Sequence, residues 1–249
     1  MTKNTTAGFA GRVGQQEASG PGIESVELVV NRYGPVADQV HAALRQAIVE
    51  VRLAPGAPIS ENSICRQFSV SRTPVRAAIQ RLSEEGLVDV YPQLGSFVAP
   101  IRLGEIQDSH FIRRSLEVAL LREVAPRWTK EMSRTMRDVI AEQERVIAAN
   151  DANGFFHADE AFHRLLGTFS GREGVWQAIL AAKVTLSRFH RYWAKPDRLP
   201  AVIEEHLAVV DALDRGDAEG AEKALVTHLD MVFVIYEQLP EEERKHLSI

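Results

Sequence analysis

The stretch VSRTPVRAAIQRL at residues 70–82 has the pattern of a capped helix with two unlike faces. Ser71 is a residue type suited to an N-cap, and Pro74 falls in the first turn, where the missing N–H of proline costs no hydrogen bond. One face is apolar and carries Val75, Ile79 and Leu82, whereas the other is polar and carries Arg72, Thr73, Arg76 and Gln80. Such a helix packs on a small domain with one face and presents cations to nucleic acid with the other.

Two further helices are predicted just before this one. From Pro35, apolar residues recur at helical spacing until the segment LAPG at residues 53–56 ends the pattern; they are Val36, Val40, Leu44, Ile48 and Val51. A short helix then begins near Ser60 and carries Ile64 and Phe68. Ser71 comes only three residues after Phe68, and two helices joined by so short a turn match a helix-turn-helix unit.

A hairpin is predicted directly after the arginine-bearing helix. Residues 87–91 and 96–99 are strand-like runs, and residues 92–95 supply turn residues between them. In this position the hairpin is the wing of a winged helix-turn-helix domain. Its tip, at Gln93, Leu94 and Gly95, would reach the minor groove or phosphates.

Composition bounds the remaining possibilities. The 249 residues are 45% hydrophobic and 25% charged, which is ordinary for a globular protein and long enough for two domains. No apolar run approaches the length of a membrane span, and the N-terminus lacks the apolar core of a secretory signal, so a cytoplasmic protein without membrane contact is expected. The single cysteine, Cys65, excludes an internal disulfide and a cysteine-based zinc site.

The net charge of −5 is unevenly distributed. Residues 32–103 carry eight Lys or Arg against six Asp or Glu, whereas the residues that follow carry 19 against 25. A modestly basic N-terminal unit joined to an acidic C-terminal unit is typical of a DNA-binding protein whose second domain has a different function.

The domain organisation follows from these patterns. Residues 1–31 are rich in Gly, Ser, Thr and Gln and are predicted to be a disordered arm. Residues 32–102 form the winged helix-turn-helix domain, residues 103–240 form an all-helical domain, and residues 241–249 form a tail. Five or six amphipathic helices are expected in the second domain, so the fold class is mainly α, with an antiparallel helical bundle at the C-terminus.

Four residues with metal-ligand chemistry lie on inward faces of the predicted bundle. Asp159 and His163 are four residues apart on the apolar stripe of one helix, while His206 and His228 lie on the stripes of two later helices. A buried carboxylate is costly unless it is paired or bound to a metal. One aspartate and three imidazoles suit a divalent transition metal, with positions left open for water or a ligand.

Hydrogen-bonded core histidines are the competing interpretation, and for a single histidine they are the commoner case. The other histidines lack a partner at ligand spacing and are predicted to be surface or capping residues; they are His41, His110, His157, His190 and His246. Arg113 and Glu117 are also four residues apart, and either form an exposed helical ion pair or lie at the cavity edge, where Arg113 would bind a ligand carboxylate.

The chain resembles the GntR family of bacterial transcription regulators. The resemblance is carried by the segment LAPG at residues 53–56, by Glu61, and by residues 70–76 and 85–88. The C-terminal half is similar to the FCD, or FadR-like, branch of that family, whose helical domain has an Arg-x-x-x-Glu pattern, an Asp-x-x-x-His pattern and two later histidines. Here these positions are Arg113 with Glu117, Asp159 with His163, His206 and His228.

The resemblance implies a homodimeric repressor or activator that binds a palindromic operator in double-stranded DNA. The implied DNA contacts are Asn62, Arg66, Ser71, Arg72, Thr73, Arg76, Gln93 and Gly95. Asn62 departs from the family, because some members have an arginine there. In the helical domain the resemblance implies a divalent metal on Asp159, His163, His206 and His228, with zinc favoured over nickel, manganese and iron, and a small carboxylate effector near Arg113 and Glu117.

Three alternatives stay open at this point. An Asp/His₃ site with an open position could activate water in a metal-dependent hydrolase, although no general base accompanies the ligands at motif spacing. A regulator with a purely structural metal would keep the fold without sensing a ligand. A nucleoid-type DNA binder would be strongly basic, and the acidic second half argues against it.

Overall fold

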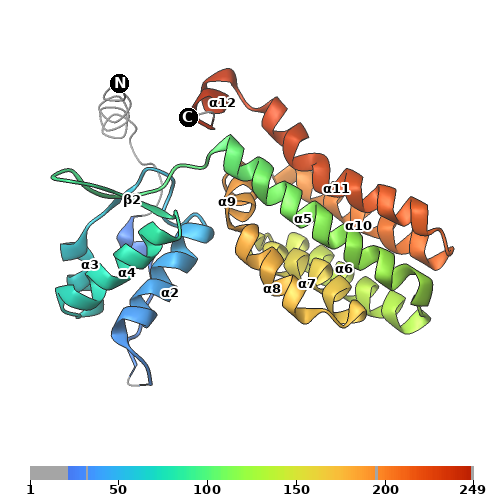
Figure 1. Cartoon of the computed structure of the whole chain (residues 1–249), viewed down its shortest axis with the longest axis horizontal. Coiled ribbons are helices and arrows are strands. Elements are labelled where there is room, and N and C mark those ends of the chain that lie inside the picture. The colour runs from blue at the N-terminus through green and yellow to red at the C-terminus, as the bar shows by residue number, and fades with distance from the viewer. Residues whose placement is uncertain (1–21, 32, 194–195, 248–249) are drawn as a thin grey trace. The chain divides into compact units, whose positions relative to one another are not determined.

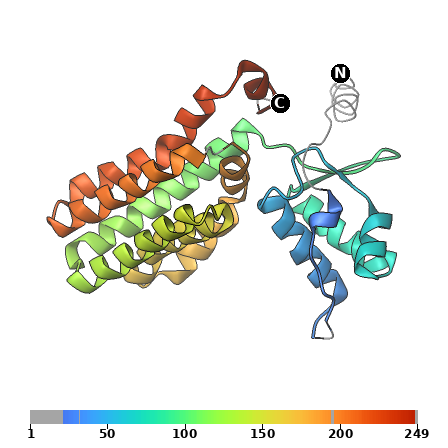
Figure 2. The same cartoon turned by 180° about the vertical axis from the view of Figure 1, so that it is seen from behind.

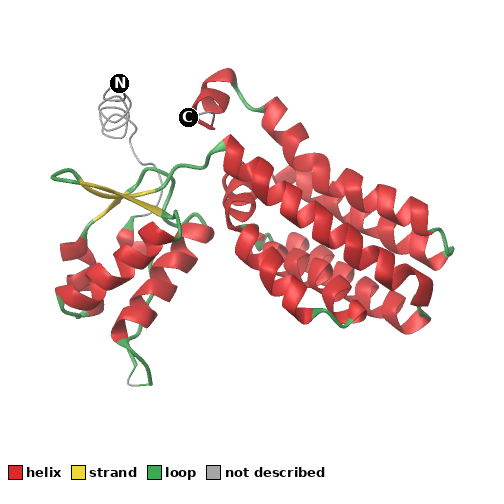
Figure 3. Ribbon diagram, in the orientation of Figure 1, coloured by secondary structure: helices red, strands yellow, loops and turns green. Residues whose placement is uncertain are grey.

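The computed structural model describes residues 22–31, 33–193 and 196–247. The chain divides into two compact units between Ile101 and Arg102, one residue before the domain boundary expected from the sequence. Strands occur only in the first unit among the described residues, and helices dominate the second (Figures 1 and 3). No helix in the described part of the chain is both long enough and apolar enough to cross a bilayer.

The first unit is a three-helix domain with a small sheet. A short 3₁₀ helix precedes the three α-helices and the three strands, in the order η1 (Ile23–Ser25), α2 (Val36–Val49), β1 (Pro58–Ile59), α3 (Glu61–Phe68), α4 (Arg72–Glu84), β2 (Val88–Tyr91) and β3 (Gly95–Val98). Helix α4 packs against both α2 and α3. The core between them is apolar and includes Leu44, Ile64, Val75 and Leu82.

The predicted helix-turn-helix is confirmed as α3, a short turn and α4. Ser60 caps α3 by accepting a hydrogen bond from the backbone N–H of Ser63, and Ser69 ends the helix in the left-handed conformation. Ser71 occupies the N-cap position of α4 as predicted, but its side chain makes no cap hydrogen bond. The exposed Ser71 hydroxyl is therefore not used by its own helix.

The predicted wing is confirmed as the antiparallel pair β2 and β3, in which Val88 lies opposite Val98 and Tyr91 opposite Gly95. A third strand, β1, pairs with the other edge of β3 and gives the order β1-β3-β2. The sequence did not predict β1 because two residues, one of them a proline, carry no alternation pattern. Its pairing anchors the wing to the loop that follows α2.

The predicted disordered arm is too long. Residues 1–21 lie outside the described residues, but residues 22–31 are ordered against the first unit. Val26 is 1% exposed and its carbonyl accepts a hydrogen bond from Gln67 Nε2, while Arg52 Nη1 donates to the carbonyl of Ser25. One buried apolar side chain and two hydrogen-bonded carbonyls hold this segment against the first unit. These contacts could not be predicted from the composition of the segment, which is polar.

The second unit is an antiparallel helical bundle built around α5 (Leu103–Val124). Helix α5 packs against α7 (Ala152–Ser170), α8 (Glu173–Ala182), α9 (Val184–Trp193) and α11 (Ala218–Gln238). Helix α10 (Leu199–Asp214) lies beside α11 and also packs on α6 (Lys130–Ala148), and the pairing of α10 with α11 is visible from both sides (Figure 2). The inward residues of α5, α7, α10 and α11 therefore meet in one interior.

The bundle has more helices than the five or six expected. Eight α-helices follow residue 102 in the described part of the chain, because α8 and α9 are separate ten-residue helices that meet at Lys183 without a glycine or proline between them. The expected tail is also partly helical, as α12 (Glu241–Leu247). Two further 3₁₀ turns, η2 (Ala125–Arg127) and η3 (Pro196–Arg198), contain the prolines that break the longer helices.

Candidate functional site

The first candidate surface is the polar face of α4. Arg72, Thr73, Arg76 and Gln80 are exposed, while Val75, Ala78, Ile79 and Leu82 on the opposite face are buried. This division matches the two faces predicted from the sequence. The cations are therefore free of the core and available to a partner.

Helix α3 and the wing extend this surface. Asn62 and Arg66 are exposed on α3, and Arg66 Nη2 lies 3.4 Å from Ser63 Oγ. Gln93 and Gly95 are exposed in and beside the turn between β2 and β3, both with positive φ, of 66° and 114°. Each residue predicted to contact DNA thus lies at the surface of the first unit.

One arginine of this surface is already held by a carboxylate. Arg76 Nε donates to Glu61 Oε2 at 2.9 Å, and Glu61 lies at the start of α3. The ion pair links the Arg76 side chain on α4 to the first residue of α3. Sequence reasoning did not assign Glu61 a role, although its place directly after the N-cap of α3 was visible.

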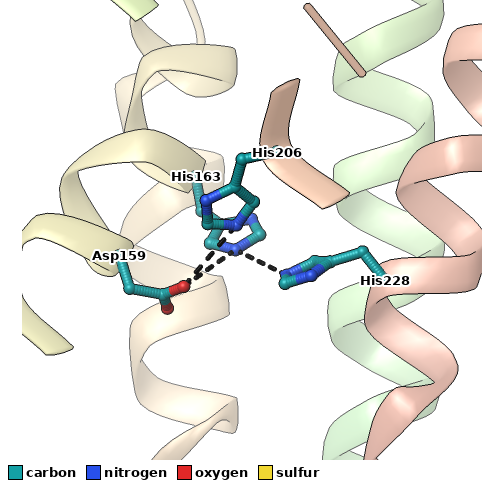
Figure 4. Close-up of side chains that lie close together, drawn as sticks. All are labelled: Asp159, His163, His206 and His228. Carbon is teal, nitrogen blue, oxygen red and sulfur yellow. Dashed lines mark hydrogen bonds and ion pairs between the residues drawn. The ribbon is translucent and has the colours of Figure 1, made fainter. Parts of the chain in front are cut away.

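The second candidate site is a cluster inside the bundle. Asp159 and His163 come from α7, His206 from α10 and His228 from α11, and the four side chains converge (Figure 4). One ligand atom from each lies within 4.8 Å of the others. His163 and His206 are fully buried, and Asp159 and His228 are largely buried. The structure thus brings together the four residues that the sequence predicted as ligands.

All three imidazoles are oriented by an acceptor on Nδ1. His163 Nδ1 lies 2.7 Å from Glu117 Oε2, His206 Nδ1 lies 3.0 Å from Gln143 Oε1, and His228 Nδ1 lies 2.8 Å from Glu205 Oε2. The amide of Gln143 is itself oriented, because its Nε2 donates to the carbonyl of Ala158. Since carboxylate and amide oxygens only accept, each ring donates from Nδ1.

In a neutral ring with the proton on Nδ1, the Nε2 atom carries a lone pair, and the Nε2 atoms of the three rings face one another. His163 Nε2 lies 3.2 Å from His228 Nε2, and the Nε2 atoms of His163 and His206 lie 3.8 and 3.6 Å from Asp159 Oδ1. His206 Nε2 is buried and has no hydrogen-bond partner. Lone pairs and a carboxylate that face one another in a buried space form a site that could hold a cation.

The electrostatics of His163 and His206 agree with neutral rings. Burial, together with the nearby His228, keeps the pKa of His206 well below its ordinary value, and burial also lowers the pKa of His163. Phe162 stacks on the His206 ring at 3.9 Å between centroids and keeps water from that face. Metal binding requires neutral imidazole, so these histidines need lose no proton at neutral pH to act as ligands.

Glu117 lies elsewhere than predicted. It is fully buried behind His163, and it accepts hydrogen bonds from His163 and from Arg113 Nε, the latter at 2.8 Å. Burial opposes its ionisation, yet the two donors hold the pKa of Glu117 below its usual range. Glu117 therefore orients a candidate ligand, and the predicted effector contact is corrected to a supporting position. The alternative of an exposed ion pair is wrong as well.

Arg113 keeps its predicted place beside a cavity. The guanidinium is 6% exposed, and its Nη2 is buried without a partner. A small cavity next to it is lined by Arg113, Phe156, Asp159, Glu160, Lys183, Leu186, Ser187, His190 and Arg191. Because Asp159 belongs to both the cluster and the cavity wall, the cavity adjoins the candidate metal centre.

The prediction that the remaining histidines are surface or capping residues is wrong for three of them. His41 is buried and pairs with Glu85 at 2.5 Å, and His110 is buried and pairs with Asp230 at 2.8 Å. His190 is half-buried in the cavity wall, where burial lowers its pKa to about 3. His157 is exposed as expected, and the side chain of His246 lies outside the described part.

Sequence reasoning also missed Lys183, Glu160 and the acceptors Gln143 and Glu205. One signal was present: Lys183, Ser187 and His190 follow one another at i, i+4 and i+7, which is the spacing of one helix face. Gln143 and Glu205 carry no comparable pattern, because their partners come from other helices.

Two family models match the chain. "Bacterial regulatory proteins, gntR family" matches residues 36–98, and "FCD domain" matches residues 108–231. They correspond to the first unit and to the bundle that holds the histidine cluster. Neither lends support to the metal-dependent hydrolase considered from the sequence.

Individual proteins agree with these matches. The HTH-type transcriptional repressor RspR of Escherichia coli (strain K12) is 32% identical over 226 residues, which span 90% of this chain and 99% of that one. A transcriptional regulator in an unstable DNA locus of Streptomyces ambofaciens is 37% identical over 195 residues, 78% of this chain and 82% of that one. The structure of a putative GntR transcriptional regulator from Rhodococcus sp. RHA1 superposes with a TM-score of 0.69 at 26% identity, covering 82% of this chain and 99% of that one. The chain therefore belongs to the gntR family of bacterial regulatory proteins, as a DNA-binding transcription regulator with a C-terminal FCD domain.

Proposed function

We propose that this regulator is a homodimeric repressor whose DNA affinity is set by a small organic acid bound at a divalent metal centre. The observation that carries the proposal is the common orientation of His163, His206 and His228, each with Nδ1 engaged and Nε2 turned to the same point beside Asp159. Zinc is the metal favoured by this ligand set, with nickel, manganese and iron as alternatives. The place of action is the bacterial cytoplasm, where the operator is.

The DNA contacts follow from the surface of the first unit. Arg72 and Arg76 on α4 reach guanine edges or phosphates in the major groove, and Ser71 and Thr73 contact the backbone. The wing around Gly95 contacts the flanking groove. Asn62 and Arg66 add contacts from α3, and a second protomer repeats the set on the other half of a palindromic operator.

The sensing site follows from the bundle. Asp159, His163, His206 and His228 would hold the metal, and Glu117, Gln143 and Glu205 would keep the imidazoles in register. When bound, the metal supplies a Lewis-acidic position for a carboxylate oxygen. Arg113 Nη2, which is buried without a partner, donates to the same carboxylate.

Coupling to DNA requires that the acid bind one arrangement of the dimer better than another. Helices α5 and α9 both contribute side chains to the cavity wall, and α5 begins directly after the boundary between the two units. A shift of α5 on ligand binding would therefore act on the segment that carries the DNA-binding domain.

The test combines metal analysis with operator binding. Full-length protein purified without chelators should contain about one divalent metal per chain, and selection from random DNA should return a two-fold symmetric sequence. His206→Ala should lose the metal, whereas His157→Ala, at an exposed histidine, should keep it. Organic acids should change the affinity of metal-loaded protein for the selected DNA and leave His206→Ala unaffected.

Two results would contradict the proposal in different ways. Natively purified protein that lacks metal, yet still responds to acids, would remove the metal centre from the mechanism. Protein whose melting temperature falls on chelation, but whose DNA affinity no organic acid alters, would have a purely structural metal.

A further inference from the structure

We infer that Leu94, at the tip of the wing, enters the minor groove of the operator and partly unstacks one base-pair step there. Leu94 would thus select DNA by how easily that step deforms. This inference rests on the proposed function, which places the wing in the groove that flanks the α4 contacts. It adds a specificity-determining residue and the property of DNA that this residue reads.

The wing differs in charge from the rest of the proposed DNA surface. Residues 87–99, which comprise β2, β3 and the turn between them, contain no Lys, Arg or His, and Asp89 is their one charged residue. Binding to phosphates depends on cations that neutralise them and release counterions. Helices α3 and α4 offer such cations with Arg66, Arg72 and Arg76, which are exposed. The contact that the wing makes with DNA therefore does not depend on charge.

The outer half of the wing is apolar instead. Leu94 is 60% exposed and Val90 is 51% exposed, whereas Val88 and Val98, which lie opposite each other at the base of the hairpin, are buried. A large aliphatic side chain that stays in water gains none of the free energy of burial. Folding of the first unit therefore does not favour a leucine at the tip, and its apolar surface is available to a partner.

The turn holds Leu94 in a fixed position. It lies at the outer edge of the first unit (Figure 3), and it is closed by a hydrogen bond of 3.2 Å from the backbone N–H of Leu94 to the carbonyl of Tyr91. Between them lie Pro92, whose ring fixes φ, and Gln93, which has the left-handed φ of 66°. Strand β1 pairs with β3 as far as Ser96, so the sheet has three strands almost to the turn. Because the tip is already ordered, little conformational entropy is lost when it binds.

An apolar side chain on a narrow, rigid tip has a known use in DNA binding. Leucine is among the residues that minor-groove proteins insert between base pairs, where they partly unstack one step and kink the duplex. Pyrimidine–purine steps unstack at the lowest cost, so a wedge favours operators that carry such a step beneath it. The amide of Gln93, beside Leu94, supplies a donor for the acceptors of adenine and thymine on the floor of the groove.

Other occupants fit the tip less well. A stable protein interface buries about 800 Å² on each partner, far more than the exposed side chains of Leu94 and Val90 supply, whereas a wedge needs a single side chain. The methyl group of thymine is a second apolar target on DNA, but it lies in the major groove, which α4 is proposed to occupy. The minor groove beside α4 is therefore the place that the wing tip fits best.

The experiment detects unstacking directly. The probe is the duplex that full-length protein selects from random DNA, with 2-aminopurine, whose fluorescence rises when it unstacks, placed at each flanking adenine in turn. The unmodified protein should raise the fluorescence at one step on each side of the palindrome. Leu94→Ala should not, and its affinity should be about 10-fold lower, because most of the apolar contact is removed. This factor should be the same at low and high salt, since no ionic contact is lost.

Two further variants control the measurement. Leu94→Met keeps an apolar side chain of similar size and should retain both the affinity and the fluorescence change. Val29→Ala shortens another exposed aliphatic side chain of the first unit and should retain both as well. A second selection, carried out with Leu94→Ala, should return the same sequence beneath α4 with a weaker preference for a pyrimidine–purine step beneath the wing. Equal melting temperatures for all variants would show that the fold is unchanged.

The outcomes separate this inference from the proposed function. Leu94→Ala that binds as tightly as the unmodified protein, or a fluorescence change that is the same in both, would overturn the wedge and leave the α4 contacts in place. A variant that alters self-association but not DNA affinity would overturn it too, since the tip would then pack on protein. If the unmodified protein selects no sequence from random DNA, the proposed function is contradicted and the inference falls with it.

Discussion

His163 Nε2 lies 3.2 Å from His228 Nε2, so the two rings face each other inside the cluster. Both rings donate from Nδ1, His163 to Glu117 and His228 to Glu205. In neutral rings the two facing lone pairs would repel at this distance, and a metal ion between them would convert the repulsion into coordination. The carboxylates behind the rings are therefore as much part of the proposed centre as the ligands are.

The first prediction concerns one of those carboxylates. Glu117→Gln should weaken metal binding by about 10- to 100-fold, because a neutral amide orients and polarises the His163 ring less strongly than a carboxylate does. Competition with a metal indicator measures the affinity. Glu144→Gln, at an exposed glutamate of α6, is the control and should leave it unchanged. Equal affinities in the two variants would show that Glu117 does not support the centre.

The second prediction concerns the polar face of α4. Arg72→Ala and Arg76→Ala should each lower affinity for the operator by about 10-fold or more, since a good arginine contact to a base is worth about 1–3 kcal/mol. Neither side chain is in the core, so the melting temperature should not change. Arg81→Ala tests an exposed arginine near the C-terminal end of α4, where it pairs with Asp38. Gel-shift titrations that show equal losses for all three variants would contradict the assignment.

The third prediction concerns Glu61. Its Oε2 accepts a hydrogen bond from Arg76 Nε at 2.9 Å, and its carboxylate places a negative charge on the surface proposed to bind DNA. Glu61→Gln should therefore raise affinity for random DNA and lower the ratio of operator to random-DNA affinity, because the repulsion weakens and Arg76 loses its fixed direction. Filter binding at several salt concentrations measures the affinity for random DNA and the affinity for the operator. An unchanged ratio would mean that Arg76 finds its position without Glu61.

The fourth prediction separates the two tasks of Arg113. Its Nε neutralises the buried Glu117, and its Nη2 is proposed to bind the effector. Arg113→Lys keeps the charge but not the forked pair of donors, so the protein should fold and respond poorly to acids. Arg113→Met removes the charge and should cost about 3–5 kcal/mol of folding free energy, as expected when one member of a buried pair is removed. Chemical unfolding and acid titration of both variants measure the two effects.

Much of the fold could be predicted because the decisive patterns are local. The stripe of Val75, Ile79 and Leu82 fixed the buried face of α4, and these three side chains are buried. The i, i+4 spacing of Asp159 and His163 likewise placed both on one side of α7. Helical periodicity carries such information within a single element, and no knowledge of the packing is needed to use it.

The supporting residues could not be predicted because their roles depend on packing. Glu117 is buried because α5 and α7 pack together, and Gln143 orients His206 only because α6 lies beside α10. The ion pair between Lys183 and Glu160 joins residues that are distant in sequence. The break between α8 and α9 could not be predicted for a different reason, because no glycine or proline marks it in the sequence.

The fifth prediction is a pH dependence that His190 contributes to the metal-free protein. Burial lowers the pKa of His190 to about 3, whereas a histidine of the unfolded chain titrates near 6.5. Between these values the unfolded chain binds a proton that the folded protein does not, so the free energy of unfolding falls as the pH drops below about 6.5. Above that pH both states are neutral at this residue and the contribution is constant. His163 and His206, whose pKa values are also lowered, act in the same direction.

Urea unfolding of chelator-treated protein between pH 7.5 and pH 5 measures how steeply the free energy of unfolding changes with pH. Each buried neutral histidine adds at most about 1.4 kcal/mol per pH unit to this slope. His190→Gln removes one titrating group and should give a shallower slope than the unmodified protein. His157→Gln, at an exposed position of α7, should retain the full slope. If His190→Gln and the unmodified protein instead lose stability equally on acidification, His190 accepts a proton in the folded state as readily as in the unfolded chain.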